Sequence, residues 1–172
     1  MEDLNQINAV LDLYVRPQTF PLAIKMLASA DEVPAKAKMP SRDLGMQMPL
    51  CQGIALSRRY GWSVTIGKED MSCPLGAVTL GFIPAKAKFL NGDFSVPSGI
   101  EGKDAKAKFA QSLPRLEHGK YTHLVAAPLS RADFEPQIIM MYGNPAQVLR
   151  LVQSAVYASG VPVMSEIFGF AA

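Results

Sequence analysis

The pattern that most constrains the fold lies in the last third of the chain. Two short apolar runs, 122–127 and 137–142, are followed by an amphipathic segment and by a third apolar run at 161–164. Apolar runs of this length are typical of buried strands. Strand, tight turn, helix and strand make a βαβ unit, which covers about 122–165 and requires parallel neighbours. The sequence therefore predicts an α/β fold with a mixed, partly parallel sheet and flanking helices.

The helix of this unit has recognisable boundaries. Gly143 makes the turn after the strand, Asn144 is a favoured N-cap, Pro145 suits the first helical position, and Gly160 ends the helix. A strand that ends in glycine at a helix start can bind a phosphate or carboxylate. Gly143 and Asn144 are therefore candidate ligand-binding residues for a small anion or nucleotide. An ordinary capped helix is the favoured alternative, because the chain contains neither GxGxxG nor GxxxxGK.

Apolar spacing and helix breakers predict the other elements. A chain of 172 residues fits a single α/β domain, residues 1–172. The expected elements are an N-terminal helix ending before Arg16, a strand over 21–27, a helix from Pro49 to about Tyr60 that ends at Gly61, a strand over 62–66, a short helix from Pro74, and a helix from Asp104 to about Leu113.

Composition narrows the class of protein. Hydrophobic residues make up 49% and charged residues 19%, a balance that favours a packed core over disorder. The net charge is only +2 and the basic residues are scattered, so no nucleic-acid partner is expected. No window approaches the roughly 18 unbroken apolar residues of a membrane helix. The acidic start lacks the pattern of a secretory signal. We therefore expect a cytoplasmic protein with no membrane partner.

The two cysteines, Cys51 and Cys73, are the leading candidates for chemistry. Each lies beside a proline at a predicted helix start, where unpaired N–H groups stabilise an anion. This placement favours a thiolate that attacks as a nucleophile or binds a metal. The alternative is a pair of buried structural thiols, since free cysteine is among the most buried residue types. Two thiols alone cannot complete a tetrahedral metal site.

No catalytic residue is assigned from the sequence. Lys68, Glu69 and Asp70 precede Cys73 and could supply a general acid or base, although a charged turn is ordinarily surface. Arg58 and Arg59 lie near the end of a predicted helix, where cations suit the helix dipole. They receive no catalytic role.

Several segments resemble the prokaryotic family called domain of unknown function 169. They are residues 49–55 (PLCQGIA), 69–77 (EDMSCPLGA), 127–129 (APL), 143–147 (GNPAQ) and 157–160 (YASG). The resemblance spans nearly the whole chain. It implies a protein of prokaryotic, often anaerobic, metabolism whose activity is not established. It also implies redox or metal chemistry at Cys51 and Cys73, with an iron–sulfur cluster or another thiolate-bound metal as the cofactor.

Members of that family continue past the segment matching residues 168–172, so the chain is expected to correspond to their N-terminal two-thirds. Only Ser165 and Glu166 are polar within 161–172. We expect this apolar end, with Phe168 and Phe170, to pack into an interface. The partner is a second copy, giving a homo-oligomer, or a separate chain that supplies the remaining part. Packing against its own core is the alternative.

Three classes of function therefore remain open. The first, which is favoured, is a cysteine-dependent metal, iron–sulfur or redox protein. The second is a non-catalytic module that binds a small anion or nucleotide near Asn144. The third is a structural assembly subunit without chemistry of its own.

Overall fold

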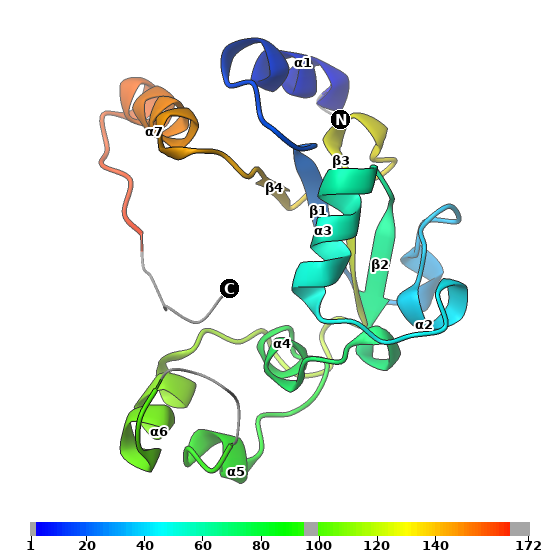
Figure 1. Cartoon of the computed structure of the whole chain (residues 1–172), viewed down its shortest axis with the longest axis vertical. Helices are drawn as coiled ribbons and strands as arrows, with labels where there is room; N and C mark the ends of the chain where they lie inside the picture. Colours follow the sequence, from blue (N-terminus) through cyan, green and yellow to red (C-terminus); the bar gives the residue numbers. More distant parts are fainter. Residues whose placement is uncertain (1–2, 95–99, 166–172) are drawn as a thin grey trace.

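The sheet has four strands in the order β2-β3-β1-β4. The computed structural model of the protein describes residues 3–94 and 100–165 (Figure 1). The strands are listed here in chain order: β1 (Leu22–Leu27), β2 (Val64–Gly67), β3 (His123–Pro128) and β4 (Ile138–Met140). β1 pairs with β3 along its whole length and with β4 on its other side, while β2 pairs with β3.

The predicted partly parallel sheet is wrong, because every strand pair is antiparallel. β3 and β4 run in the same direction, but β1 lies between them, so they never form a parallel pair. The βαβ unit is wrong for a second reason. Residues 161–165 form no strand after helix α7 (Pro145–Ser159). Local spacing identified the segments of β3 and β4 but could not show that β1, from the start of the chain, lies between them.

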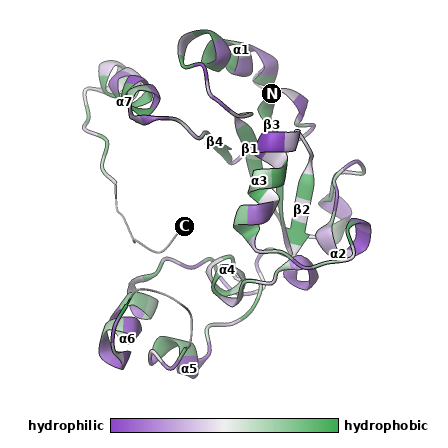
Figure 2. Ribbon diagram, in the orientation of Figure 1, coloured by the Kyte–Doolittle hydropathy of each residue, from purple (hydrophilic) through white to green (hydrophobic). Residues whose placement is uncertain are grey.

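The core lies between one face of the sheet and helix α3 (Leu50–Tyr60), which packs on β2 and β3. Alternate strand residues share a face, so each strand contributes every second side chain to this core. The buried sheet residues of this cluster are Leu22, Ile24, Val64, Ile66, Leu124 and Ala126. Gly53 of α3 allows close approach, because a Cβ there would lie 2.4 Å from Cδ1 of Ile66. Hydrophobic residues accordingly run along the strands in Figure 2, whereas α2 is mostly hydrophilic.

Most of the predicted helices are confirmed. The remaining elements are α1 (Leu4–Tyr14), η1 (Ala30–Glu32), α2 (Pro40–Asp43), η2 (Lys68–Asp70), α4 (Pro74–Thr79), α5 (Ala87–Leu90), α6 (Lys103–Ser112) and η3 (Leu129–Arg131). Gly61 ends α3 with a φ of 72°, as its sequence position predicts. Asp104 is not the cap of α6: Gly102 takes that position, and the helix begins one residue before Asp104.

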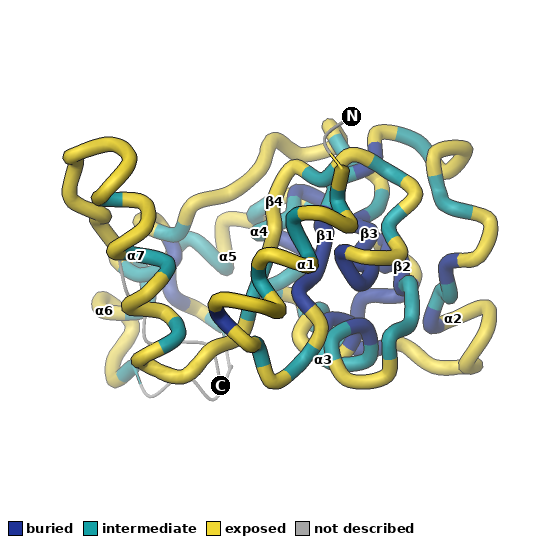
Figure 3. Tube along the Cα trace, turned by 90° about the horizontal axis from the view of Figure 1, so that it is seen from above, coloured by how far each residue is buried: buried dark blue, intermediate teal, exposed yellow. Residues whose placement is uncertain are grey.

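Helix α7 extends away from the sheet (Figure 1), and none of its residues is buried (Figure 3). Two of its side chains form hydrogen bonds with the N-terminal part. Gln147 Nε2 donates to the carbonyl oxygens of Val15 and Arg16, and Arg150 donates to that of Tyr14 at 3.0 Å. The segment expected to form an interface begins at Val161 and is exposed up to Ser165, while Phe168 and Phe170 lie outside the described residues.

No helix among the described residues has the length and apolar character needed to cross a membrane.

Candidate functional site

The structure brings the two cysteine segments together. Met48 and Met71 form a parallel β-bridge. The N–H of Met48 donates to the carbonyl oxygen of Asp70 at 2.9 Å, and the N–H of Ser72 donates to that of Met48 at 3.2 Å. Shortly after the bridge, Cys51 lies in the first turn of α3 and Cys73 is the N-cap of α4. Two segments that are distant in sequence are therefore paired shortly before their helices begin.

The two thiols differ in their surroundings. Cys51 is exposed, whereas Cys73 is half-buried and packs against the core cluster. The Sγ atom of Cys73 accepts a hydrogen bond from the N–H of Gly76 at 3.4 Å. Neither cysteine is in a disulfide. Each thiol is therefore free, and the pair combines one accessible and one partly protected sulfur.

Gly76 lies beside two sulfur atoms. A Cβ on this residue would lie 3.4 Å from Sδ of Met71 and 3.8 Å from Sγ of Cys73. The thioether and the thiol therefore border the same small volume. Soft sulfur ligands of these two kinds favour thiophilic metals. Within the described residues, no group of three or more His, Cys, Asp or Glu side chains is placed to hold a metal ion.

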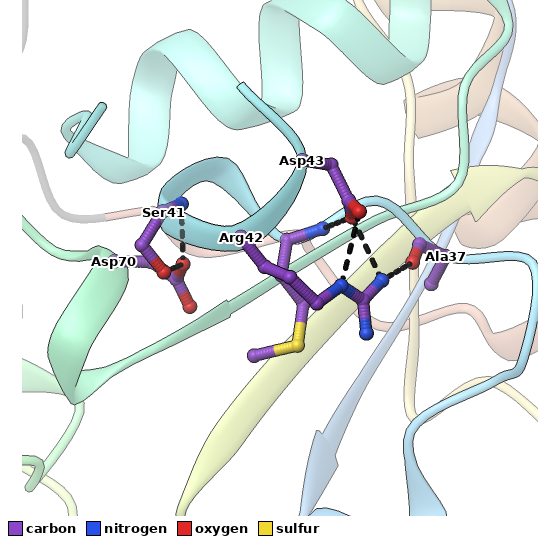
Figure 4. A network of polar contacts seen from close by, with 6 residues as sticks. Ala37, Ser41, Arg42, Asp43 and Asp70 are labelled. Atoms are coloured by element: carbon purple, nitrogen blue, oxygen red, sulfur yellow. Dashed lines mark hydrogen bonds and ion pairs between the residues drawn. The ribbon is translucent and has the colours of Figure 1, made fainter. Parts of the chain in front are cut away.

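A buried carboxylate, Asp70, holds the segment before Cys73 in place (Figure 4). Its side chain is fully buried and accepts hydrogen bonds from the N–H and hydroxyl of Ser41 and from the N–H of Gly67. These bonds join α2 to η2 and to the end of β2. Because the backbone oxygen of Asp70 also accepts from Met48, this residue stabilises the bridge between the cysteine segments. Its hydrogen bonds indicate a positioning role.

Arg42 and Asp43 form a second polar group on α2 (Figure 4). Their ion pair measures 2.7 Å, and Arg42 also donates to the carbonyl oxygen of Ala37 at 3.1 Å. Hydrogen bonds from Arg42 and from the N–H of Met39 lower the pKa of Asp43 to about 2. The pair is solvent-exposed, so its contribution to stability is small.

His123 is a candidate that the sequence did not single out. It lines a cavity of about 300 Å³ together with Asp70, Lys68 and Tyr121. Burial lowers the pKa of His123, against an opposing effect of the nearby Asp70 carboxylate. Its ring lies against Gly67, where a Cβ would come within 2.6 Å of Cδ2. Only the pairing of β2 with β3 brings these two residues together, so no local pattern could reveal the contact.

At the predicted anion site, Asn144 is the N-cap of α7, as expected. Its side chain accepts from the N–H of Gln147 at 3.0 Å, and the Gln147 side chain accepts from the N–H of Asn144 at 2.8 Å. Pro145 has no N–H group, and the N–H group of Val148 donates to the carbonyl oxygen of Asn144. Few donors therefore remain at this helix start for an anion. The ligand-binding role of Gly143 and Asn144 stays a prediction.

Fold and site together define a class: a small α/β protein with an antiparallel four-stranded sheet and two free thiols, each near the start of a helix. The family model of domain of unknown function 169, described as "Uncharacterised ArCR", matches residues 10–172, and the chain belongs to this family. The resemblance noted in the sequence is thus confirmed. A relative from Methanocaldococcus jannaschii, "Uncharacterized protein MJ0308", is 27% identical over 173 residues, covering 97% of this chain and 72% of the relative. No solved structure matches the chain.

Proposed function

We propose that the protein is a cysteine-dependent metal-binding protein in which Cys51 and Cys73 act together as thiolate ligands. The observation that supports this function is the Met48–Met71 bridge, which sets the two cysteine segments side by side. A purely structural pair of thiols would be expected to lie buried. Cys51 is instead exposed, and Cys73 is only half-buried.

The ligand set favours a thiophilic metal ion or an iron–sulfur cluster. Thiolates bind zinc and iron–sulfur clusters, and a thioether such as that of Met71 adds affinity for Cu(I). Two thiolates leave a four-ligand shell incomplete. The remaining ligands would come from outside the described residues, from a second copy, or from a separate chain. The exposed position of Cys51 permits ligands from another chain to reach the same ion.

Metal content of the anaerobically purified protein tests the proposal. We expect bound metal, and a visible absorption band if an iron–sulfur cluster is present. Cys51→Ser and Cys73→Ser should each lose most of the metal. Gln52→Ala, an exposed neighbour of Cys51, should retain it. Wild-type protein that stays metal-free after anaerobic reconstitution with iron and sulfide, or with zinc or Cu(I), would reject the metal function.

A redox function is the second candidate, because both thiols are free and one is exposed. Oxidation by diamide would join the two sulfurs, with two electrons passing to the oxidant and two protons leaving the thiols. Disulfide formation requires the Cβ atoms to approach to about 3.8 Å. Mass spectrometry should then show an intramolecular disulfide that dithiothreitol reverses. Failure to form it at micromolar protein concentration argues against this candidate.

We further propose that α7 and the segment after it contact a second copy or another chain. Val148 and Leu149 of α7 are 44% and 54% exposed, and Met164 is 88% exposed. Light scattering of the pure protein should show a dimer or larger species, and Leu149→Ser should shift it toward monomer. A stable wild-type monomer with no co-purifying chain would contradict this proposal.

The cytoplasmic location, the single domain and the absence of a nucleic-acid partner remain predictions.

A further inference from the structure

A cavity of about 710 Å³ lies between the end of α3 and the segment that joins α1 to β1. Arg58 and Arg59 form one wall, and residues 17–21 form another. The N–H of Phe20 donates to the carbonyl oxygen of Arg58 at 3.0 Å, which holds the two walls together. The volume falls within the range of small-molecule sites. This cavity is separate from the cysteine segments, none of whose residues lines it.

The charge of the cavity favours an anion. The Arg58 guanidinium lies over the ring of Tyr142, with Cζ 4.1 Å from the centroid, so its position is restrained. Arg59 is exposed and has no ion pair in the part of the chain that the structure describes. Asp12 also lines the cavity and accepts a hydrogen bond from Asn8 at 2.8 Å. An unpaired guanidinium such as that of Arg59 binds a carboxylate or phosphate group through two parallel hydrogen bonds.

One residue of the cavity lining carries an unpaired hydroxyl. The Oγ1 atom of Thr19 is buried and has no hydrogen-bond partner among the described residues, although Thr19 is one of the lining residues. Buried polar atoms are nearly always paired, so an unpaired oxygen favours rearrangement toward a new acceptor. Rotation of the Thr19 side chain about χ1 would turn its hydroxyl toward a ligand oxygen in the cavity.

The backbone beside the cavity is strained. Arg16 has a φ of 56° and is the sole non-glycine residue with positive φ in the described ranges. It directly precedes Pro17, which lines the cavity. Side chains disfavour this conformation, and such strain is concentrated at functional sites.

We propose that this cavity binds a small organic anion whose carboxylate or phosphate group pairs with the Arg59 guanidinium and accepts a hydrogen bond from Thr19. From the sequence, Arg58 and Arg59 were expected only to interact favourably with the helix dipole. The structure adds the cavity, the restrained guanidinium and the unpaired hydroxyl. Tyr60 and Phe20 in the lining favour a ligand with a planar or apolar part beside its charge.

Calorimetric titration of the full-length protein with inorganic phosphate, citrate and AMP tests the inference. At least one probe should bind saturably. Arg59→Ala should weaken that binding by about tenfold or more, since it removes charge-assisted hydrogen bonds. Lys36→Ala removes one exposed positive charge elsewhere and should leave binding unchanged. Thr19→Val should weaken binding while raising the melting temperature of the free protein, because it removes the unpaired hydroxyl.

The three probes distinguish the chemistry. Binding of phosphate and AMP without citrate identifies a phosphate site, and the reverse identifies a carboxylate site. Tighter binding of AMP than of phosphate supports a contribution from the aromatic lining. The inference is overturned if no probe binds saturably up to about 10 mM. Equal losses in Arg59→Ala and Lys36→Ala would also overturn it, because they would show only a general charge effect.

Discussion

Gly81 ends α4 against the backbone of Glu117, so closely that a Cβ on Gly81 would lie 2.6 Å from the Glu117 carbonyl oxygen. Gly81 has a φ of 73°, and its own carbonyl accepts from the N–H of Gly119 at 3.1 Å. This contact joins the helix that Cys73 begins to the loop before β3. The position therefore requires glycine both for its backbone conformation and for lack of space.

Gly81→Ala should destabilise the protein by roughly 2–3 kcal/mol, because it adds steric conflict with a backbone atom to the cost of positive φ. Gly45→Ala is the matched control. Gly45 also has a positive φ, of 66°, but nothing lies within 4 Å of its Cβ position. That variant should lose only about 1 kcal/mol. Urea unfolding of the two variants gives the comparison, and equal losses would show that space at Gly81 is not limiting.

Asp70→Ala should be among the more destabilising substitutions. It leaves the N–H groups of Ser41 and Gly67 without their acceptor, at a cost of roughly 2–4 kcal/mol. Asp43→Asn, which alters an exposed carboxylate on the helix that contains Ser41, should have a much smaller effect. Thermal unfolding measures both. If Asp70 stabilises the bridge at Met48, the Asp70→Ala variant should also bind less metal at the cysteines. An unchanged stability of this variant would contradict the role assigned to the Asp70 hydrogen bonds.

The pH dependence of stability should carry a contribution from His123. Burial lowers its pKa below 6.5, so the unfolded chain binds the proton more readily than the folded protein. This contribution is therefore fully favourable above pH 6.5 and is lost as the pH falls through the folded pKa. Wild-type protein should lose more stability between pH 7.5 and pH 5.5 than His123→Gln.

The same residue allows a second test. Because the Asp70 carboxylate raises the pKa of His123, Asp70→Asn should lower that pKa further. Nuclear magnetic resonance titration of the imidazole protons measures both proteins directly. A wild-type pKa at or above 6.5 would show that burial does not govern this site.

Gln147 should control the attachment of α7. Its side chain completes the capping box with Asn144 and donates to Val15 and Arg16. Gln147→Ala should lose about 1 kcal/mol of local stability and speed amide exchange in α7, while β1 and β3 keep their protection. Gln153→Ala, on the same helix and exposed, should leave exchange in α7 nearly unchanged. Equal exchange in the two variants would contradict the role of Gln147.

Local signals in the sequence account for much of the secondary structure. Asn144, Pro145 and Gly160 bound α7 as their residue types predict, since capping depends on a few neighbouring backbone groups. The cysteines were also identified at helix starts, because prolines flank both of them. By contrast, Asp104 was assigned to a cap that Gly102 occupies. Adjacent residues compete for such a position, and composition alone does not decide between them.

By itself, the sequence determined the four strands, the longer helices, the family and the choice of Cys51 and Cys73 as candidates, because each of these depends on residues close together in the chain. Only the tertiary structure decided the sheet order, the Met48–Met71 bridge and the cavity beside Arg59. Each of these depends on contacts between distant segments. Insertion of β1 between β3 and β4 is the clearest case: burial of apolar faces selects this arrangement, and strand spacing cannot show which partner a strand takes.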